Sequence, residues 1–244
     1  MVDGYDAIIS LGEACPPAFN IRQFVQNDRA FPFDWWVSSR VGIEQIIKND
    51  FTGLYQIENM RLTPNGNSIE DTKYRIYYHH KFADVPGGPV VENFAERIPK
   101  RLERFNALAA RMNAICASGR VLFVRQEFKD LRDWDGSAMA TIARAVSWLE
   151  MFREKWPRGQ ADLLVLDSGD EIPDPLKFSS GTAFFDSVET LPKDGLWKPL
   201  AFAAIFKRHG FVSLTPRTGV KRENPEQDLA APDWDIAATY PVPA

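Results

Sequence analysis

The sequence predicts an α/β protein in which a mostly parallel sheet is covered by helices on both faces. Short apolar runs with the length of buried strands, such as Val121–Val124 and Leu163–Leu166, alternate with longer stretches whose apolar residues recur at helical spacing. Such alternation favours parallel strands joined by helical crossovers. The 244 residues, 45% of them hydrophobic, suffice for a sizeable core. We expect a single α/β domain over residues 1–220 and a loosely packed C-terminal tail over residues 221–244.

The first predicted unit is a strand, a tight turn and a helix. Tyr5–Leu11 is a near-continuous apolar run that ends at Gly12. Apolar residues at helical spacing follow a pair of prolines, Pro16 and Pro17. Because proline is favoured in the first turn of a helix, Cys15 is expected at or beside the N-cap. The unit therefore carries a thiol at its turn.

The rest of the chain continues the alternation. Up to residue 119 we expect an aromatic segment (29–37), a helix (41–50), a loop or hairpin turn (60–72), a strand or strand end (74–82) and a long helix (94–119) that Pro99 either starts or kinks. Beyond the strand at 121–124 we expect a charged loop (125–135), a helix with Met139, Ile142, Val146, Leu149 and Phe152 on its apolar face, the strand 163–166, another at 183–185, a helix (200–209) and a last strand (211–214).

Composition excludes several classes of function. The net charge of −4 gives no footprint for nucleic acid or for an anionic membrane, and no run approaches the roughly 18 apolar residues of a membrane span. Two cysteines and three histidines form neither a disulfide framework nor a zinc array, so no metal or cofactor is expected. The first residues lack the basic character of a secretory signal, and we expect a cytoplasmic protein with a small-molecule, peptide or glycan substrate. The oligomeric state stays open.

Several reactive side chains follow the predicted strands. Cys15 follows the first strand, Arg125 and Glu127 follow the strand 121–124, and Asp167 and Asp170 follow the strand 163–166. In open α/β sheets the functional crevice lies outside the carboxyl ends of the strands. We therefore expect these side chains at one edge, with Arg125, Glu127 and Asp167 as substrate-binding candidates.

Cys15 is the candidate nucleophile. The positive end of a helix dipole and free backbone N–H groups both favour a thiolate at an N-terminus. Pro16 and Pro17 remove two of those donors, which weakens the effect. The alternative for Cys15 is a small buried cysteine that packs under the turn. Cys116 lies on the apolar stripe of its helix, and we interpret it as a core residue.

His79 and His80 end a predicted strand, where neighbouring side chains point to opposite faces. One of them is the candidate base for Cys15, with Asp84 as the acid that fixes its tautomer; the alternative is a hydrated strand end. His209 precedes Gly210 and is interpreted as a cation at a helix C-terminus.

Asp34 is surrounded by large aromatics and needs a buried partner, for which Arg29 or a backbone turn is the simplest expectation. The segment is either a structural corner or a substrate-binding wall that includes Trp35. The basic residues 97–104 indicate a solvated helix face or an anion clamp. The acidic run 167–171 is typical of a turn and is only a weak cation motif.

Five segments together resemble a bacterial family of uncharacterised proteins named putative papain-like cysteine peptidases, the DUF1796 family. The resemblance spans about residues 5–170 and rests on Leu11-Gly12-x-x-Cys15, Pro32-Phe33-Asp34-Trp35, His79-His80-Lys81-Phe82, the arginines at 97, 101 and 104, and Leu122-Phe123-Val124-Arg125. It implies Cys15 as the nucleophile and His80 as the base. The family usually has His-Asp-Phe where this chain has His-His-Lys-Phe, so the choice of histidine and of orienting acid stays open.

The first hypothesis is a thiol-dependent hydrolase or acyl transferase in which Cys15 attacks an acyl carbon and a histidine moves the proton. The second is a transferase or hydrolase of bacterial polysaccharide metabolism that uses the carboxylates of Asp34, Glu127 or Asp167, with Arg125 as an anion clamp. The third is a binding domain without catalysis, in which Cys15 only caps a helix.

Overall fold

The computed structural model describes residues 4–25, 29–78, 81–84, 88–127, 137–167, 172–189 and 198–211. The predicted mixed α/β fold is confirmed. A five-stranded sheet has the order β1-β6-β7-β9-β8, in which β8 is antiparallel to β9 and the other pairs are parallel. Its strands are β1 (Ala7–Ser10), β6 (Arg120–Gln126), β7 (Gln160–Leu166), β8 (Leu176–Phe178) and β9 (Gly181–Asp186).

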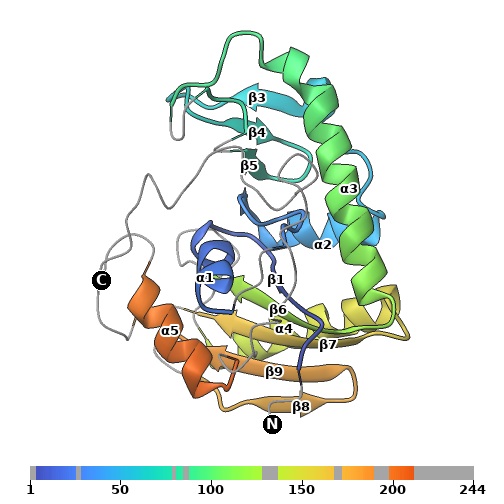
Figure 1. The fold of residues 1–244 in the computed structure, drawn as a ribbon, viewed down its shortest axis with the longest axis vertical. Coiled ribbons are helices and arrows are strands. Elements are labelled where there is room, and N and C mark those ends of the chain that lie inside the picture. Colours follow the sequence, from blue (N-terminus) through green and yellow to red (C-terminus); the bar gives the residue numbers. More distant parts are fainter. Residues whose placement is uncertain are drawn as a thin grey trace, which may run out of the picture.

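Helices cover both faces of this sheet (Figure 1). On one face, α2 (Arg40–Lys48), α3 (Ile98–Cys116) and α4 (Ala138–Lys155) share a core with Phe123, Leu163 and Ala183. On the other face, α1 (Pro16–Val25) and α5 (Pro199–Arg208) pack over Leu122, Leu164 and their neighbours. Alternate residues of each strand enter different cores, as the pleat requires. No helix among the described residues is long and apolar enough to cross a membrane.

A second, antiparallel sheet was not predicted. It has the order β2-β5-β4-β3, with strands β2 (Val37–Ser38), β3 (Met60–Leu62), β4 (Ile69–Asp71) and β5 (Ile76–Tyr78). These strands have two or three residues each, too few to show a period-2 pattern in the sequence. The expected turn in residues 60–72 is confirmed as the β3–β4 hairpin.

Aromatic packing joins the two sheets. Trp36, 1% exposed, stacks on Phe105 of α3 with ring centroids 5.4 Å apart and makes an edge contact of 5.4 Å with Tyr78 of β5. In Figure 1, α3 runs along one side of both sheets. The end of β5, where the sequence places its histidines, is therefore anchored to the same core as the parallel sheet.

Helices α3 and α4 differ in detail from what their sequences predict. The long helix starts beside Pro99, which lies in its first turn: α3 begins at Ile98, after a 3-10 turn over Phe94–Arg97. The apolar face predicted for α4 was partly wrong, since Met139 is 72% exposed. Leu149 and Phe152 are buried as expected, but the stripe begins at Thr141 and Ala145, so it is rotated near the start of the helix.

The remaining terminal expectations fall largely beyond the described structure. Phe211 lies in a turn after α5, and the rest of the strand expected at 211–214 lies outside the described residues, as does the predicted tail over 221–244. A further 3-10 helix at Ile57–Asn59 precedes β3.

Candidate active site

The site is built on the turn between β1 and α1. Leu11 donates its N–H to the carbonyl of Val124 at 2.9 Å and so extends the pairing of β1 with β6. The chain then enters the left-handed region twice in succession, at Gly12 (φ 77°) and Glu13 (φ 69°). The carbonyl of Cys15 accepts the N–H of Phe19 at 3.1 Å, so Cys15 caps α1 as predicted.

The Cys15 side chain lies in an apolar environment. The residue is 7% exposed and packs with Phe19 of α1 and Trp35. Burial raises the pKa of the thiol to about 12; the nearby Lys81 ammonium lowers the pKa and the Asp34 carboxylate raises it. The thiol is therefore protonated at neutral pH, and its proton must be removed before the sulfur can act as a nucleophile.

Asp34 has its buried partner. Its Oδ2 accepts from the Arg22 guanidinium at 2.6 Å and from the N–H of Phe31 at 2.9 Å. The partner is thus Arg22 of α1 and a backbone turn, where Arg29 was the expected side chain. Burial raises the pKa of Asp34, and Arg22 opposes that shift. Arg22 also lies over the Trp35 ring, 5.1 Å from its centroid, so ion pair and aromatic wall form one unit beside Cys15.

The histidines that the sequence singles out, His79 and His80, lie outside the described residues. Their neighbours on both sides are described. Tyr78 ends β5 against Trp36, and Lys81 donates its N–H to the Tyr78 carbonyl at 3.5 Å. The Lys81 charge lowers the pKa of both Cys15 and Asp34. The chain therefore passes within electrostatic reach of the thiol directly after His80.

Asp84, the acid expected to orient the histidine, lies at the surface. Its side chain is 73% exposed and its Oδ1 pairs with Arg97, at the start of the basic run. Asp34 is 3% exposed, and its charge acts on the Cys15 thiol. Of the two acids, Asp34 has the surroundings that an orienting carboxylate needs.

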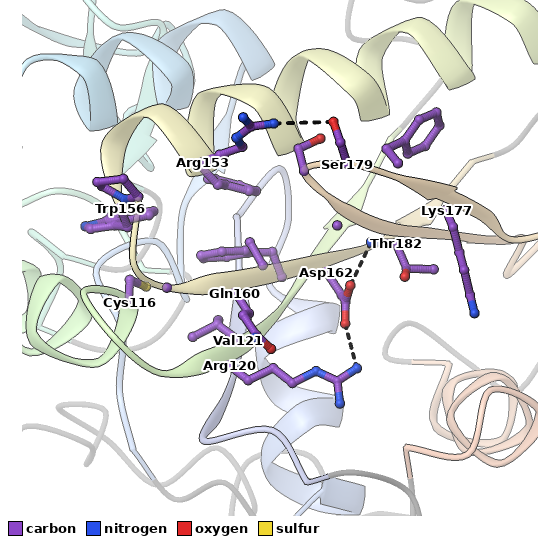
Figure 2. A pocket seen from close by; sticks show the side chains of 18 residues that line it. Cys116, Arg120, Val121, Arg153, Trp156, Gln160, Asp162, Lys177, Ser179 and Thr182 are labelled. Carbon is purple, nitrogen blue, oxygen red and sulfur yellow. Dashed lines mark hydrogen bonds and ion pairs between the residues drawn. The ribbon is translucent and has the colours of Figure 1, made fainter.

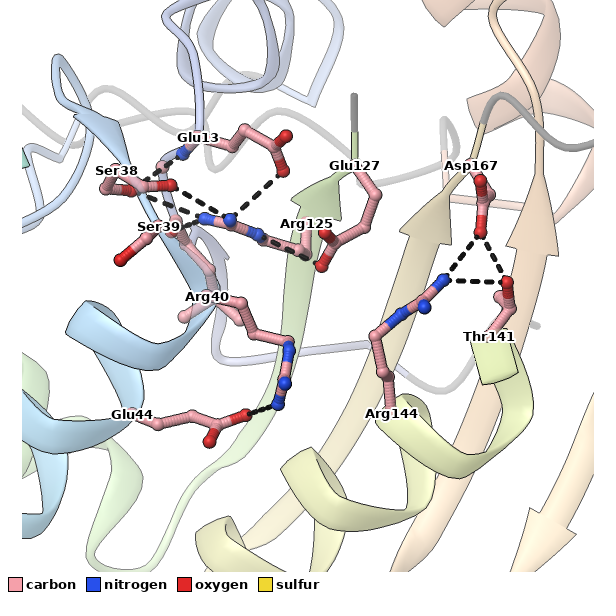
Figure 3. Close-up of polar contacts among 12 residues, drawn as sticks. Glu13, Ser38, Ser39, Arg40, Glu44, Arg125, Glu127, Thr141, Arg144 and Asp167 are labelled. Carbon is pink, nitrogen blue, oxygen red and sulfur yellow. Dashed lines mark hydrogen bonds and ion pairs between the residues drawn. The ribbon is translucent and has the colours of Figure 1, made fainter. Parts of the chain in front are cut away.

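Arg125 occupies the carboxyl end of β6 and is 1% exposed. Nη1 donates to the Leu11 carbonyl at 2.9 Å and to Ser38 Oγ at 3.3 Å, and Nη2 donates to the Ser38 carbonyl at 3.0 Å. Nη2 also pairs with Glu13 at 3.0 Å, and Nε pairs with Glu127 at 3.3 Å. Figure 3 shows the guanidinium enclosed between the Glu13 turn and β2. The side chain predicted to bind substrate is thus surrounded by protein acceptors.

Asp167 follows β7 at the same edge of the sheet and is 2% exposed. Its Oδ2 accepts from Thr141 Oγ1 at the start of α4 and from the Arg144 guanidinium at 3.2 Å (Figure 3). Glu127 has a side chain that is 11% exposed. Glu13, Glu127 and Asp167 therefore follow the carboxyl ends of three neighbouring strands, β1, β6 and β7, whereas Asp170 lies outside the described residues.

Cys116 lies away from this edge, whereas His209 contacts Asp186 at the end of β9, and the Asp186 carbonyl accepts the N–H of Asp167 at 3.0 Å. Cys116 is 3% exposed in the last turn of α3, and burial raises its pKa to about 12. His209 is the C-cap of α5, as predicted for a helix end. Its Nε2 lies 3.0 Å from Oδ2 of Asp186, which also pairs with Arg208 at 2.8 Å.

A cavity of about 470 Å³ lies at the opposite, amino-terminal edge of the sheet, between the starts of β6, β7 and β9 (Figure 2). Both arginines that line it have protein partners: Arg120 pairs with Asp162 at 3.1 Å, and Arg153 donates to Ser179 Oγ at 3.3 Å. Arg120 and Arg153 also approach the cavity from different faces of the sheet, since Arg120 lies with the residues under α5 and Arg153 is on α4. The two arginines of this cavity therefore do not converge on one point.

Sequence reasoning missed Glu13, Ser38 and Arg22. Glu13 follows Gly12 in a turn, where a solvated acid is the ordinary expectation, and nothing in the sequence marks it as buried. Arg22 lies two helical turns after Cys15, on a helix whose neighbours were unknown. The sequence indicated only that Asp34 has a partner, because a carboxylate buried among aromatic residues requires one.

Comparison with known proteins places the chain in a family. The family model described as putative papain-like cysteine peptidase (DUF1796) matches residues 6–147. The chain belongs to the DUF1796 family. The match covers both the Cys15 turn and the Lys81 segment, as well as all of β6. No curated protein and no solved structure matches the chain.

Proposed function

We propose that this DUF1796 protein is a thiol-dependent hydrolase or acyl transferase in which Cys15 is the nucleophile and His80 the base, with His79 as the alternative base. One observation carries the proposal: the thiol caps α1 at the carboxyl end of β1, and the Lys81 ammonium, which follows His80 in the sequence, lowers the pKa of that thiol. The family description supports the same chemistry.

The buried thiol determines the mechanism. Because the pKa of Cys15 is raised to about 12, the resting site holds a thiol and not a thiolate. The imidazole takes the Sγ proton as the sulfur attacks the acyl carbon, and the resulting imidazolium returns that proton to the leaving group. The C–N or C–O bond breaks and a thioester on Cys15 remains. Water, or an acceptor nucleophile, then attacks the thioester and regenerates the thiol.

The surroundings of Cys15 supply the remaining roles. Asp34, held by Arg22, is the proposed acid that orients the imidazole, with Asp84 as the exposed alternative. The backbone N–H of Cys15 supplies part of the oxyanion site, since Pro16 and Pro17 have none to offer. Trp35 is the proposed wall for the acyl group. Peptides and acylated glycans or small molecules all present such an acyl carbon.

Alkylation mapped by mass spectrometry tests the proposal. Iodoacetamide is added to the folded protein at pH 7, and the rates at Cys15 and Cys116 are compared. Both residues are buried, at 7% and 3% exposure, so Cys116 is an internal reference. We expect Cys15 to react at least about tenfold faster, and a His79→Ala/His80→Ala variant to lose this difference. Equal rates in the unaltered protein would contradict Cys15 as the nucleophile. They would favour the glycan hypothesis, in which the carboxylates of Glu127 and Asp167 act.

A further inference from the structure

The guanidinium of Arg125 is surrounded by acceptors of the protein itself. An arginine has five N–H donors in a fixed planar arrangement. Here five acceptors lie within 3.3 Å of its three nitrogens: the Leu11 carbonyl, both oxygens of Ser38, and the carboxylates of Glu13 and Glu127. With a side chain that is 1% exposed, Arg125 is enclosed by these acceptors and is not accessible to a substrate. Its function must lie in what it holds.

What Arg125 holds is the turn that carries Cys15. Leu11 is the last residue before the turn, and Glu13 is its second left-handed residue. The left-handed backbone conformation costs a non-glycine residue roughly 1–2 kcal/mol of conformational free energy. It persists only where surrounding contacts fix it. At Glu13 the contacts are the Arg125 ion pair and the N–H donated to Ser38 Oγ at 2.9 Å. Arg125 thus binds both ends of the Gly12–Glu13 bend.

The same side chain ties the turn to the antiparallel sheet. Ser38 belongs to β2, which pairs with β5 through Ser38 and Ile76. The strand β5 ends at Tyr78, directly before the histidines. One guanidinium therefore connects the turn that carries Cys15 with β2 of the antiparallel sheet (Figure 3).

We propose that Arg125 is a positioning residue: its buried guanidinium fixes the turn that carries Cys15 against β2, and so sets the position of the thiol relative to the antiparallel sheet whose strand β5 precedes His79 and His80 in the sequence. This inference rests on the proposed function. It replaces the substrate-binding role that the sequence suggests for Arg125.

A double-mutant cycle tests this role. Iodoacetamide labelling of Cys15 at pH 7 is measured with and without the His79→Ala/His80→Ala change, in the native background and in Arg125→Met. We expect the histidine change to slow labelling at least about tenfold in the native background and less than about twofold in Arg125→Met, because the proton transfer is already lost. A merely structural arginine would lower stability and leave the tenfold histidine effect in place.

Three controls keep the cycle interpretable. Protection of Cys116, 3% exposed, reports that a variant is folded. Arg120→Met removes an arginine at the other end of β6 that also pairs with a buried acid, Asp162, and should leave the histidine effect unchanged. Where Arg125→Met does not fold, Arg125→Lys replaces it, since one ammonium cannot hold Leu11, Ser38 and Glu13 at once.

The outcomes separate the two claims. A tenfold histidine effect in both backgrounds overturns the positioning role and leaves the proposed function intact. No histidine effect in the native background overturns the proposed function, and the positioning role falls with it. A histidine effect that is lost in Arg125→Met and kept in Arg120→Met supports both.

Discussion

The guanidinium of Arg125 lies 3.0 Å from the carboxylate of Glu13, and both side chains are 1% exposed. A buried ion pair of this kind is weak evidence for stability, because desolvation of two charges offsets most of their attraction. Its location is more informative. It fixes a left-handed residue two positions before the candidate nucleophile, in a turn that must be rigid if thiol and base are to meet.

Gly12→Ala tests the need for this turn geometry. Gly12 has φ 77°, and a Cβ there would lie 2.6 Å from Ser38 Oγ and 3.3 Å from the Phe33 carbonyl. We expect the free energy of unfolding to fall by about 2–4 kcal/mol, from backbone strain plus overpacking. Gly66→Ala is the matched control, with φ 72° and open space around its Cβ, and should cost only about 1–2 kcal/mol in urea denaturation. Equal losses would mean that the Ser38 contact is unimportant.

Lys81→Met tests the electrostatics of the thiol. The Lys81 ammonium lowers the pKa of Cys15, so its removal should raise that pKa and slow alkylation near pH 9 by up to about tenfold, the effect of one pKa unit. The pH profile of iodoacetamide labelling measures the change. Lys73→Met removes a lysine that lies over the Tyr74 ring, 5.0 Å from its centroid, and should leave the profile in place. A shift toward lower pH in Lys81→Met would contradict the arrangement.

Trp36→Ala tests the junction between the two sheets. Trp36 packs between Phe105 and Tyr78 and is 1% exposed, so its truncation should lower the free energy of unfolding by about 3–5 kcal/mol. The control Leu62→Ala removes a side chain that is 55% exposed and should change stability by no more than about 0.5 kcal/mol. Denaturant titration gives both values. A loss below about 1 kcal/mol in Trp36→Ala would show that the sheets are held together elsewhere.

Asp186 predicts a dependence of stability on pH. Burial works to raise its pKa, but the hydrogen bond from His209, the Ser187 N–H and the Arg208 charge outweigh burial and lower it. Because the folded pKa lies below the unfolded value of about 3.9, the stabilisation is present above that pH and is lost as pH falls through the folded pKa. The free energy of unfolding should therefore decline below about pH 4. Asp186→Asn should be less stable at neutral pH and show a smaller acid decline, and an unchanged decline would exclude this carboxylate as its source.

The parallel sheet and its helices could be predicted because their patterns are long. The seven-residue strands β6 and β7 and the nineteen-residue helix α3 contain enough residues for a period to show. The antiparallel sheet could not, because its strands are stabilised by pairing and by the Trp36 core and not by a pattern of their own.

The residues of the candidate site also differ in whether the sequence could predict them. Cys15 could be predicted because a strand, a glycine and a proline pair mark its turn in the sequence. The partners Glu13 and Arg125 are 112 residues apart in the sequence, and only the β1–β6 pairing brings them together. Arg22 was missed as the partner of Asp34 for a related reason: the choice between Arg22 and Arg29 depends on the path of the chain after α1.

The distance between Cys15 Sγ and the nearest imidazole nitrogen of His79 or His80, measured in a crystal structure, tests the central claim most directly. A thiol–imidazole pair predicts a separation of roughly 3–4 Å, close to hydrogen-bond reach in a site without ligand. A separation several times larger, with both histidines turned to solvent, would contradict the proposed nucleophile and base.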